Sequence, residues 1–136
     1  SLKGSMLRAR DRSKKDWLIL IPADRLALST RYERNVSAMF KECFIELEGS
    51  YVFQQDRVPR NFDSIDYPRP PRAYFLLNAS LGTRVQLSSK QPLYISLSAT
   101  NLLNQAYRDY LDAFRYFINQ PGTDIALRLR LPFEYN

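Results

Sequence analysis

The sequence has no histidine and only one cysteine, Cys43, among its 136 residues. Without histidine, neither a Ser-His-Asp triad nor a Cys-His pair can form, and histidine metal sites are excluded as well. A single cysteine excludes an internal disulfide and a multi-cysteine zinc site. The chain carries no nucleophile motif, so an enzyme is the least expected class of protein, and we expect no cofactor.

Long apolar runs are also missing. The longest, WLILIPA at residues 17–23, is far shorter than the ~18 residues that a membrane-spanning helix needs. The sequence shows no signal-peptide pattern, and no apolar stripe of helical period is long enough to predict a helix. It opens without methionine on SLKGSMLRAR, which has the pattern of a strand, so we interpret the chain as a piece of a longer protein.

Charge is abundant but dispersed along the chain. Lysine and arginine number 20 against 14 acidic residues, a net charge of +6, which suggests nucleic acid or anionic lipid as a partner. The densest basic run, RARDRSKK at residues 8–15, is interrupted by aspartate, and we interpret it as a solvated loop. A nucleic-acid binder of the OB type would interleave arginine and aromatic residues on one strand face. The strands of this chain separate the two kinds, so we expect no nucleic-acid partner.

What the sequence does have is a strict alternation of apolar and polar residues. In TDIALRLRLPF, residues 123–133, every second residue from Ile125 to Phe133 is apolar. Because successive side chains of a strand point to opposite faces, this pattern predicts a β-strand with one apolar face. The same pattern predicts strands over residues 25–33, 42–54, 74–87 and 93–100, and less regularly over residues 2–10.

The connections between these six strands alternate in length. Residues 34–41 and 88–92 form short connections, whereas residues 11–24, 56–72 and 104–122 form long ones. A strict short-long alternation predicts an antiparallel up-and-down meander with the long loops at one end, whereas a Greek-key sandwich mixes loop lengths at both ends. The predicted fold class is therefore all-β.

The alternation alone fits two environments. The apolar face is either the core of a soluble all-β ligand-binding domain or the lipid surface of an outer-membrane barrel. Strands of about ten residues and long loops at one end favour the barrel. So do the aromatic residues near strand ends: Tyr32, Tyr51, Phe53, Tyr74, Phe75, Phe133 and Tyr135. The soluble alternative predicts a monodisperse monomer in buffer without detergent.

One part of the sequence is more specific. LYISLSATNLLNQAYRDY, followed by FRYFINQPGTDIALRLRLPF, resembles the C-terminal end of a TonB-dependent outer-membrane receptor. The matching positions are Asn101, Leu102, Leu103, Asn104, Tyr107, Pro121, Gly122 and Phe133. IPADRLALSTRYE and AYFLLNASLGTRV are similar to strands of the same family. The chain departs from the family pattern in having Pro132 inside its last strand and Tyr135 and Asn136 after the closing aromatic residue.

The resemblance implies that residues 1–136 are the last six strands of a large transmembrane β-barrel of about 22 strands, whose plug and earlier strands are absent from this sequence. It implies location in the outer membrane of a Gram-negative bacterium, with the long loops extracellular and the short turns periplasmic. The implied function is active import of a scarce nutrient such as a ferric chelate (siderophore), haem or cobalamin. The implied partners are outer-membrane lipid, the missing plug and strands, a TonB-type energy-coupling protein acting through the plug, and the imported ligand.

The candidate ligand-binding residues lie in the two later long loops, where aromatic and arginine side chains could bind an anionic iron chelate or a large cofactor. They are Tyr67, Arg69, Arg72, Arg108, Tyr110, Arg115 and Tyr116. Glu46 and Glu48 share a strand face, and we interpret them as part of a salt-bridged row with Arg84, Arg128 or Arg130 rather than as an acid-base pair. Asn101 and Asn104 are predicted to satisfy backbone groups where a strand leaves the sheet, and Cys43 to face lipid or core as a small apolar residue.

Overall fold

The computed structural model describes residues 1–59, 69–88 and 91–132. Tyr67, Phe133 and Tyr135, which carry sequence predictions, lie outside these residues. The described residues form strands and loops. Among them, no helix is long and apolar enough to cross a membrane.

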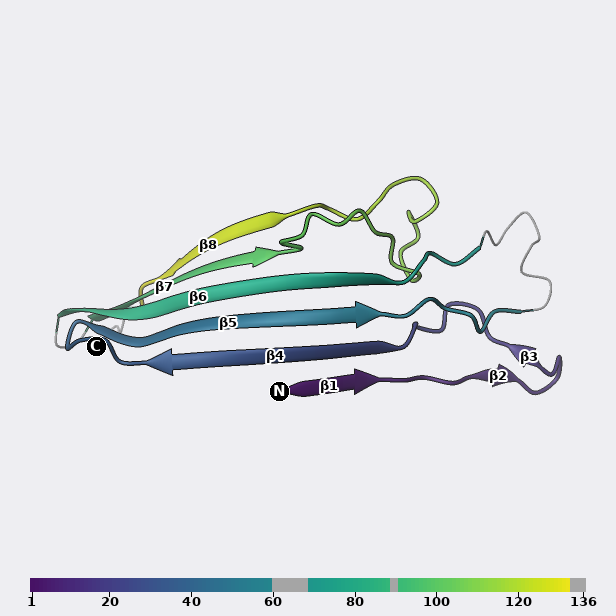
Figure 1. Ribbon diagram of the computed structural model, residues 1–136, viewed down its shortest axis with the longest axis horizontal. Helices are drawn as coiled ribbons and strands as arrows, with labels where there is room; N and C mark the ends of the chain where they lie inside the picture. The colour runs from purple at the N-terminus through teal and green to yellow at the C-terminus, as the bar shows by residue number, and fades with distance from the viewer. Residues whose placement is uncertain (60–68, 89–90, 133–136) are drawn as a thin grey trace.

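A single antiparallel sheet of six strands dominates the structure (Figure 1). Its strands are β1 (Leu2–Ser5), β4 (Arg25–Arg34), β5 (Phe40–Val52), β6 (Tyr74–Ser88), β7 (Gln91–Thr100) and β8 (Asp124–Arg130). They lie side by side in chain order, with short connections from β4 to β5 and from β6 to β7 at one end, and longer connections at the other end. The predicted all-β meander is confirmed. The sheet is open, with β1 and β8 at its edges.

The first strand is shorter than its sequence predicts. The alternation suggested a strand over residues 2–10, but β1 ends at Ser5, which lies opposite Arg25, the first residue of β4. Beyond this point β4 offers no partner for continued pairing. Residues Arg10–Asp11 instead form β2, which pairs with β3 (Asp16–Trp17) in a separate two-stranded hairpin that the sequence analysis missed.

The strand register brings the apolar positions together on one face of the sheet. One row runs straight across five strands, from Tyr32 through Ile45, Leu81 and Leu97 to Leu127. Residues directly opposite one another in neighbouring strands point to the same face. A slip of one residue in any strand would move its apolar side chains to the other face, so the rows fix the register of the whole sheet. We call this surface the apolar face and the opposite surface the polar face.

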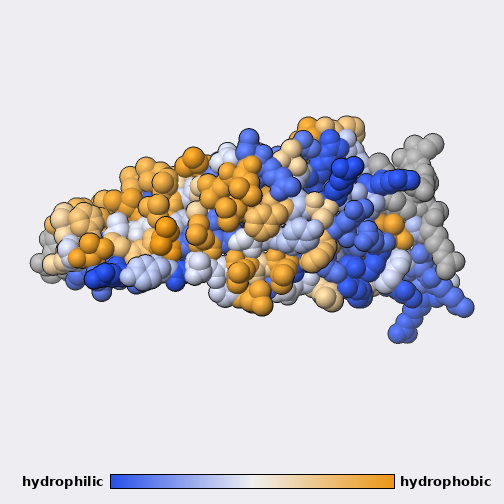
Figure 2. All heavy atoms as spheres, viewed as in Figure 1, coloured by the Kyte–Doolittle hydropathy of each residue, from blue (hydrophilic) through white to orange (hydrophobic). Residues whose placement is uncertain are grey.

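The apolar face is uncovered in the part of the chain that the structure describes. Ile45 and Leu81 are 50% exposed and Leu127 is 65% exposed, although they lie in the middle of long strands. Their polar neighbours Glu46 and Glu48 in β5 are only partly exposed. Figure 2 shows apolar residues spread over the strands and hydrophilic residues gathered at the end with the long loops. The sheet thus exposes its apolar side, the reverse of a soluble antiparallel sheet that covers this side with its core.

The small hydrophobic core lies elsewhere, at the end of the sheet with the long loops. It consists of the buried residues Ala23, Val52 and Tyr74, with Leu76 and Tyr107 packed against them. Tyr74 lies at a strand end, as predicted, but it is opposite Val52 and shares the polar face with it. It is therefore buried, unlike the other described aromatic residues in the predicted set. Those are Tyr32 (63% exposed), Tyr51 (39%), Phe53 (47%) and Phe75 (38%).

Candidate functional site

The polar face carries short-range ion pairs between neighbouring strands. Glu46 Oε2 lies 3.4 Å from Arg31 Nη1, and Glu48 Oε1 accepts a hydrogen bond of 3.3 Å from Asn78 Nδ2. The predicted pairing of these glutamates with Arg84, Arg128 or Arg130 does not occur among the described residues. Arg128 lies in β8, three strands away from β5, and strands spaced by about 4.8 Å place it roughly 14 Å off, too far for an ion pair.

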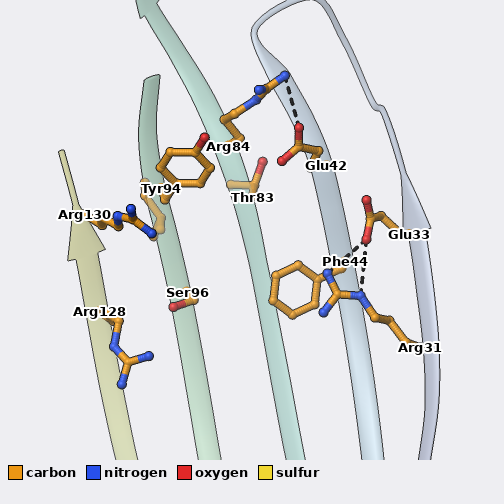
Figure 3. Close-up of a pocket in the computed structure, with 11 residues that line it drawn as sticks. Arg31, Glu33, Glu42, Phe44, Thr83, Arg84, Tyr94, Ser96, Arg128 and Arg130 are labelled. Carbon is orange, nitrogen blue, oxygen red and sulfur yellow. Dashed lines mark hydrogen bonds and ion pairs between the residues drawn. The ribbon is translucent and has the colours of Figure 1, made fainter. Parts of the chain in front are cut away.

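A pocket of about 320 Å³ opens on the polar face near the short turns (Figure 3). Phe44 lies flat in it, because Gly82 on the neighbouring strand leaves room for the ring. A Cβ added to Gly82 would meet Phe44 Cε1 at 2.6 Å. The guanidinium group of Arg31 stacks over Phe44 at 3.9 Å from the ring centre. The absence of a side chain at Gly82 thus leaves space for the Phe44 ring, and the ring in turn holds the Arg31 guanidinium above it.

The pocket carries an excess of positive charge. Its charged lining consists of Arg31, Arg84, Arg128, Arg130, Glu33 and Glu42. Arg31 pairs with Glu33 at 2.9 Å and Arg84 with Glu42 at 3.1 Å. Arg128 and Arg130 have no carboxylate partner among the described residues, and Arg130 lies 5.9 Å from the centre of the Tyr94 ring. Two guanidinium groups are therefore free to bind an anion. The two-residue period assigned Arg84, Arg128 and Arg130 to this face, and it places Arg31, Phe44 and Tyr94 beside them. The expected separation of arginine and aromatic residues onto different strand faces is therefore wrong at this pocket.

At the other end of the sheet, Arg72 and Arg108 from the predicted set come together. Both line a pocket of about 210 Å³ that also includes Tyr107 and Asn119. Arg108 Nε donates a hydrogen bond of 2.8 Å to Asn119 Oδ1. Arg72 and Arg108 are both exposed, so this pocket offers two cations to solvent. Arg69 is also exposed but is not among its lining residues.

The other three described candidates pack against one another. Arg115 is 5% exposed, and its guanidinium lies 4.3 Å from the ring centre of Tyr116 and 5.0 Å from that of Tyr110. It donates hydrogen bonds to the Tyr116 hydroxyl and to the Asp112 carbonyl. These buried contacts stabilise the connection between β7 and β8. The structure therefore divides the predicted residues into an exposed pair of arginines and a buried arginine between two tyrosines.

Several residues at this end were not predicted from the sequence. Asp109 Oδ2 forms an ion pair with Arg25 Nη2 at 2.6 Å and accepts a hydrogen bond of 2.9 Å from the Tyr74 hydroxyl. Gln55 is 1% exposed and donates from Nε2 to the carbonyls of Ile21 and Pro22. Nothing in the local pattern indicates these pairs, because their members are far apart in the sequence.

Asp24 is held by two arginines from different segments. Arg8 contacts both of its carboxylate oxygens at 2.7 and 3.0 Å, and Arg57 contacts both at 2.8 and 3.2 Å. The hydrogen bonds from Arg8 are the largest cause that lowers the pKa of Asp24 below its ordinary value. Partial burial opposes the effect, and Arg57 adds to it. Asp24 thus connects the segment after β1 to the segment after β5 just before β4 begins.

The predicted structural role of Asn101 and Asn104 is confirmed. Asn101 is 3% exposed and has a φ of 50°. Its side-chain Nδ2 donates hydrogen bonds to the carbonyls of Gln105 and Pro121, and its Oδ1 accepts one from the N–H of Gln105. Asn104 has φ of 47°, and its Oδ1 accepts a hydrogen bond from the N–H of Thr123. A Cβ on Gly122 would lie 2.4 Å from this oxygen, so a larger residue there would displace the Asn104 amide. The motif residues hold together the two ends of the connection between β7 and β8.

Cys43 is partly buried, and its Sγ lies 3.1 Å from Thr83 Oγ1. The described residues contain no group of three His, Cys, Asp or Glu side chains that could hold a metal ion. The arginine side chains that line the two charged pockets suit them to binding anions. Comparison with protein-family models, with curated proteins and with solved structures finds no match for this chain.

Proposed function

We propose that this chain is the C-terminal part of the β-barrel of a TonB-dependent outer-membrane receptor, which imports a scarce nutrient with energy from an inner-membrane complex. The observation that carries the proposal is the uncovered apolar face. Its central side chains, such as Leu81 and Leu127, are half or more exposed, whereas the opposite face carries ion pairs such as Arg31 with Glu46. Exposed apolar surface is unfavourable in water but stable against lipid, and a barrel wall with a polar lumen needs this arrangement.

The dimensions of the strands support the same proposal. β4 and β7 contain 10 residues each, β5 contains 13 and β6 contains 15. Ten residues at about 3.3 Å span roughly 33 Å, and a tilt of about 45° reduces this to roughly 23 Å along the membrane normal. The apolar band of outer-membrane barrels is about 25 Å tall. Tyr32 at one end of the apolar face and Tyr51, Phe53 and Phe75 at the other suit the two membrane interfaces.

In this proposal the long loops face outward and take part in capturing the ligand. The exposed pair Arg72 and Arg108 would bind the anionic groups of a ferric chelate, haem or cobalamin, because guanidinium groups recognise carboxylate and phosphate oxygens in pairs. The plug and the preceding strands, absent from this sequence, would complete the lumen, and a TonB-type protein would act through the plug. The cluster around Asn101 supports the resemblance, since the residues that carry it form one hydrogen-bonded structural unit.

A labelling experiment tests the membrane part of the proposal. In a Cys43→Ser background, single cysteines replace Leu81, Leu97 and Leu127 on the apolar face, or Ser80, Ser96 and Ala126 on the polar face. Each carries a nitroxide label, and the chain is folded in detergent micelles. We expect apolar-face labels to be accessible to oxygen dissolved in the micelle and polar-face labels to a water-soluble nickel chelate. Apolar-face labels shielded from both reagents would indicate a covered core and support the soluble β-domain instead.

An uptake measurement tests the transport part. The full-length protein that contains this chain is expressed in cells that lack other uptake routes, and the accumulation of a labelled ferric chelate, haem or cobalamin is measured. Replacing both Arg72 and Arg108 with alanine should lower uptake of one of these ligands. Replacing Arg34 and Lys41 at the opposite end should leave uptake unchanged. Failure of all three ligands to accumulate would contradict the proposed substrate classes.

A further inference from the structure

The hairpin formed by β2 and β3 is a basic feature that the proposed function does not use. Residues 10–17 carry four cationic side chains against two aspartates. Arg12, Lys14 and Lys15 are exposed and make no ion pair with the described residues. The turn is fixed by Asp11, whose Oδ1 accepts the N–H groups of Ser13 and Lys14 at 2.8 and 3.2 Å. The Asp11 carboxylate is thus used by the turn, and the side chains of Arg12, Lys14 and Lys15 remain available to an anionic partner.

The base of this hairpin is apolar. Met6 and Leu7 lead into it directly after β1 and are 75% and 48% exposed, and Leu18, Ile19 and Leu20 lead out of it with exposures of 41%, 38% and 52%. Figure 1 places β2 and β3 beyond the end of β1 and β4, at the end with the long loops, and Figure 2 shows hydrophilic residues protruding there. The hairpin therefore combines an apolar base directly after β1 with a cationic tip farther out.

The strand pair farthest from the turn holds the only tryptophan of the chain. Arg10 lies opposite Trp17, and its guanidinium stacks over the indole ring at 4.1 Å from the centre. The two residues line a pocket of about 200 Å³ together with Lys15, Asp16 and Val58. Tryptophan and basic side chains are the residues that settle at the headgroup level of a membrane, where an apolar ring and a polar partner are both satisfied.

We propose that the β2–β3 hairpin is a docking surface for the phosphate groups of anionic lipid headgroups. This inference rests on the proposed function, because it requires the apolar face to lie in lipid. The apolar base then continues the lipid-facing surface to the edge of the acyl region, and Arg10, Arg12, Lys14 and Lys15 reach the layer of phosphates above it. Cations close to an anionic lipid surface gain favourable interaction energy that fades within a Debye length, so the attraction is local to this hairpin.

Trp17 provides a reporter at the proposed site. The chain is folded in micelles of the neutral detergent dodecyl maltoside, and phosphatidylglycerol or phosphatidylcholine with brominated acyl chains is added. Bromine quenches tryptophan only at short range, so the fluorescence of Trp17 reports lipid next to the hairpin. We expect phosphatidylglycerol to quench at much lower lipid fractions than phosphatidylcholine, and added salt to reduce the difference.

Paired variants assign the effect to the hairpin. Arg12→Gln with Lys14→Gln removes two cations from the tip, and Arg34→Gln with Lys41→Gln removes two from the opposite end, so both variants have the same net charge. The tip variant should bind phosphatidylglycerol about 30-fold more weakly, since each cation near the surface contributes a factor of about five. The control variant should bind like the original chain.

The outcomes separate this inference from the proposed function. Equal quenching by the two lipids, or an equal loss in both variants, would overturn the docking surface while the labelling of the apolar face still supports the barrel. Nitroxide labels on the apolar face that are shielded from the micelle would overturn the proposed function itself.

Discussion

At the scale of single residues, Leu127 and Ala126 form the sharpest comparison. They are neighbours in β8 and point to opposite faces, Leu127 into the apolar row with Leu97 and Ala126 toward the polar face opposite Ser98. If the apolar face meets lipid, Leu127→Arg should lower the free energy of unfolding in micelles by about 2–4 kcal/mol, because a cation near the middle of the band is poorly solvated. Ala126→Arg should cost much less. Denaturant unfolding of both variants measures the difference, and equal costs would contradict a lipid-facing strand.

Asp24 gives a second prediction at this scale, through its pH dependence. Its pKa is lowered in the folded chain, mainly by the hydrogen bonds from Arg8, so the ionised form stabilises the fold. This stabilisation is complete above the ordinary aspartate pKa of about 3.9 and is lost as the pH falls from there through the lowered value. Asp24→Asn should therefore destabilise the chain at neutral pH, and the difference from the original chain should shrink below about pH 4.

Asp56→Asn is the matched control for this change. Asp56 is exposed, lies next to Arg57 in the chain and takes part in none of the ion pairs of Asp24. Its replacement should change the unfolding free energy little at neutral pH. A difference between the Asp24 variant and the original chain that stays constant down to acid pH would show that the carboxylate charge is not the cause.

At the scale of elements, the connection between β7 and β8 depends on Asn101. This residue combines a buried amide with three hydrogen bonds and a positive φ. Asn101→Ala removes the bonds and places alanine in an unfavourable conformation, so we expect a loss of about 2–4 kcal/mol in unfolding free energy. Asn101→Gly removes the same bonds but tolerates the backbone, so it should be less destabilising by about 1 kcal/mol. Equal stabilities of the two variants would show that the backbone conformation is not strained.

The strands themselves could be predicted from the sequence because a two-residue period survives in each of them. The segments from Arg25, from Tyr74 and from Asp124 all have the expected faces, and the loop lengths predicted their order. The β2–β3 hairpin could not be predicted, because strands of two residues are too short to show a period. The local sequence feature that marks this hairpin is Asp11, whose side chain accepts a hydrogen bond from the turn.

The partners of charged residues were predictable only in part. Glu46 and Arg84 were assigned to the correct face, but their partners Arg31 and Glu42 depend on the register and on the irregular pairing between Lys41 and Phe44. A period of two identifies the face of a residue and leaves its neighbours open until the register is known. The burial of the loop candidates could not be predicted either, because no local sequence pattern distinguishes the exposed Arg108 from the buried Arg115.

At the scale of the whole molecule, the open sheet has two consequences that share one cause. β1 and β8 each pair on one side only, so the outer row of backbone N–H and C=O groups is unpaired in the described structure. Inside a bilayer such a row cannot be tolerated, which implies that the chain does not span a membrane by itself. In water the same row on an apolar strand recruits further strands from other chains. The isolated chain should therefore be unable to remain a monomer in either setting unless a neighbour or a detergent covers it.

We accordingly expect the 136-residue chain to self-associate in buffer through β1 and β8 and to disperse in detergent, as measured by sedimentation velocity. Placing Lys at Leu127 and Leu129 on the edge strand β8 should reduce association, because charges next to an open edge repel an incoming strand. Placing Lys at Leu47 and Leu81 adds the same charge to interior strands and leaves both edges open, so it should reduce association less. Equal reductions would assign the association to the apolar face rather than to the edges. A compact monomer of the original chain in buffer would contradict association through the edges and through the apolar face alike. It would favour a soluble β-domain whose apolar face is covered in solution.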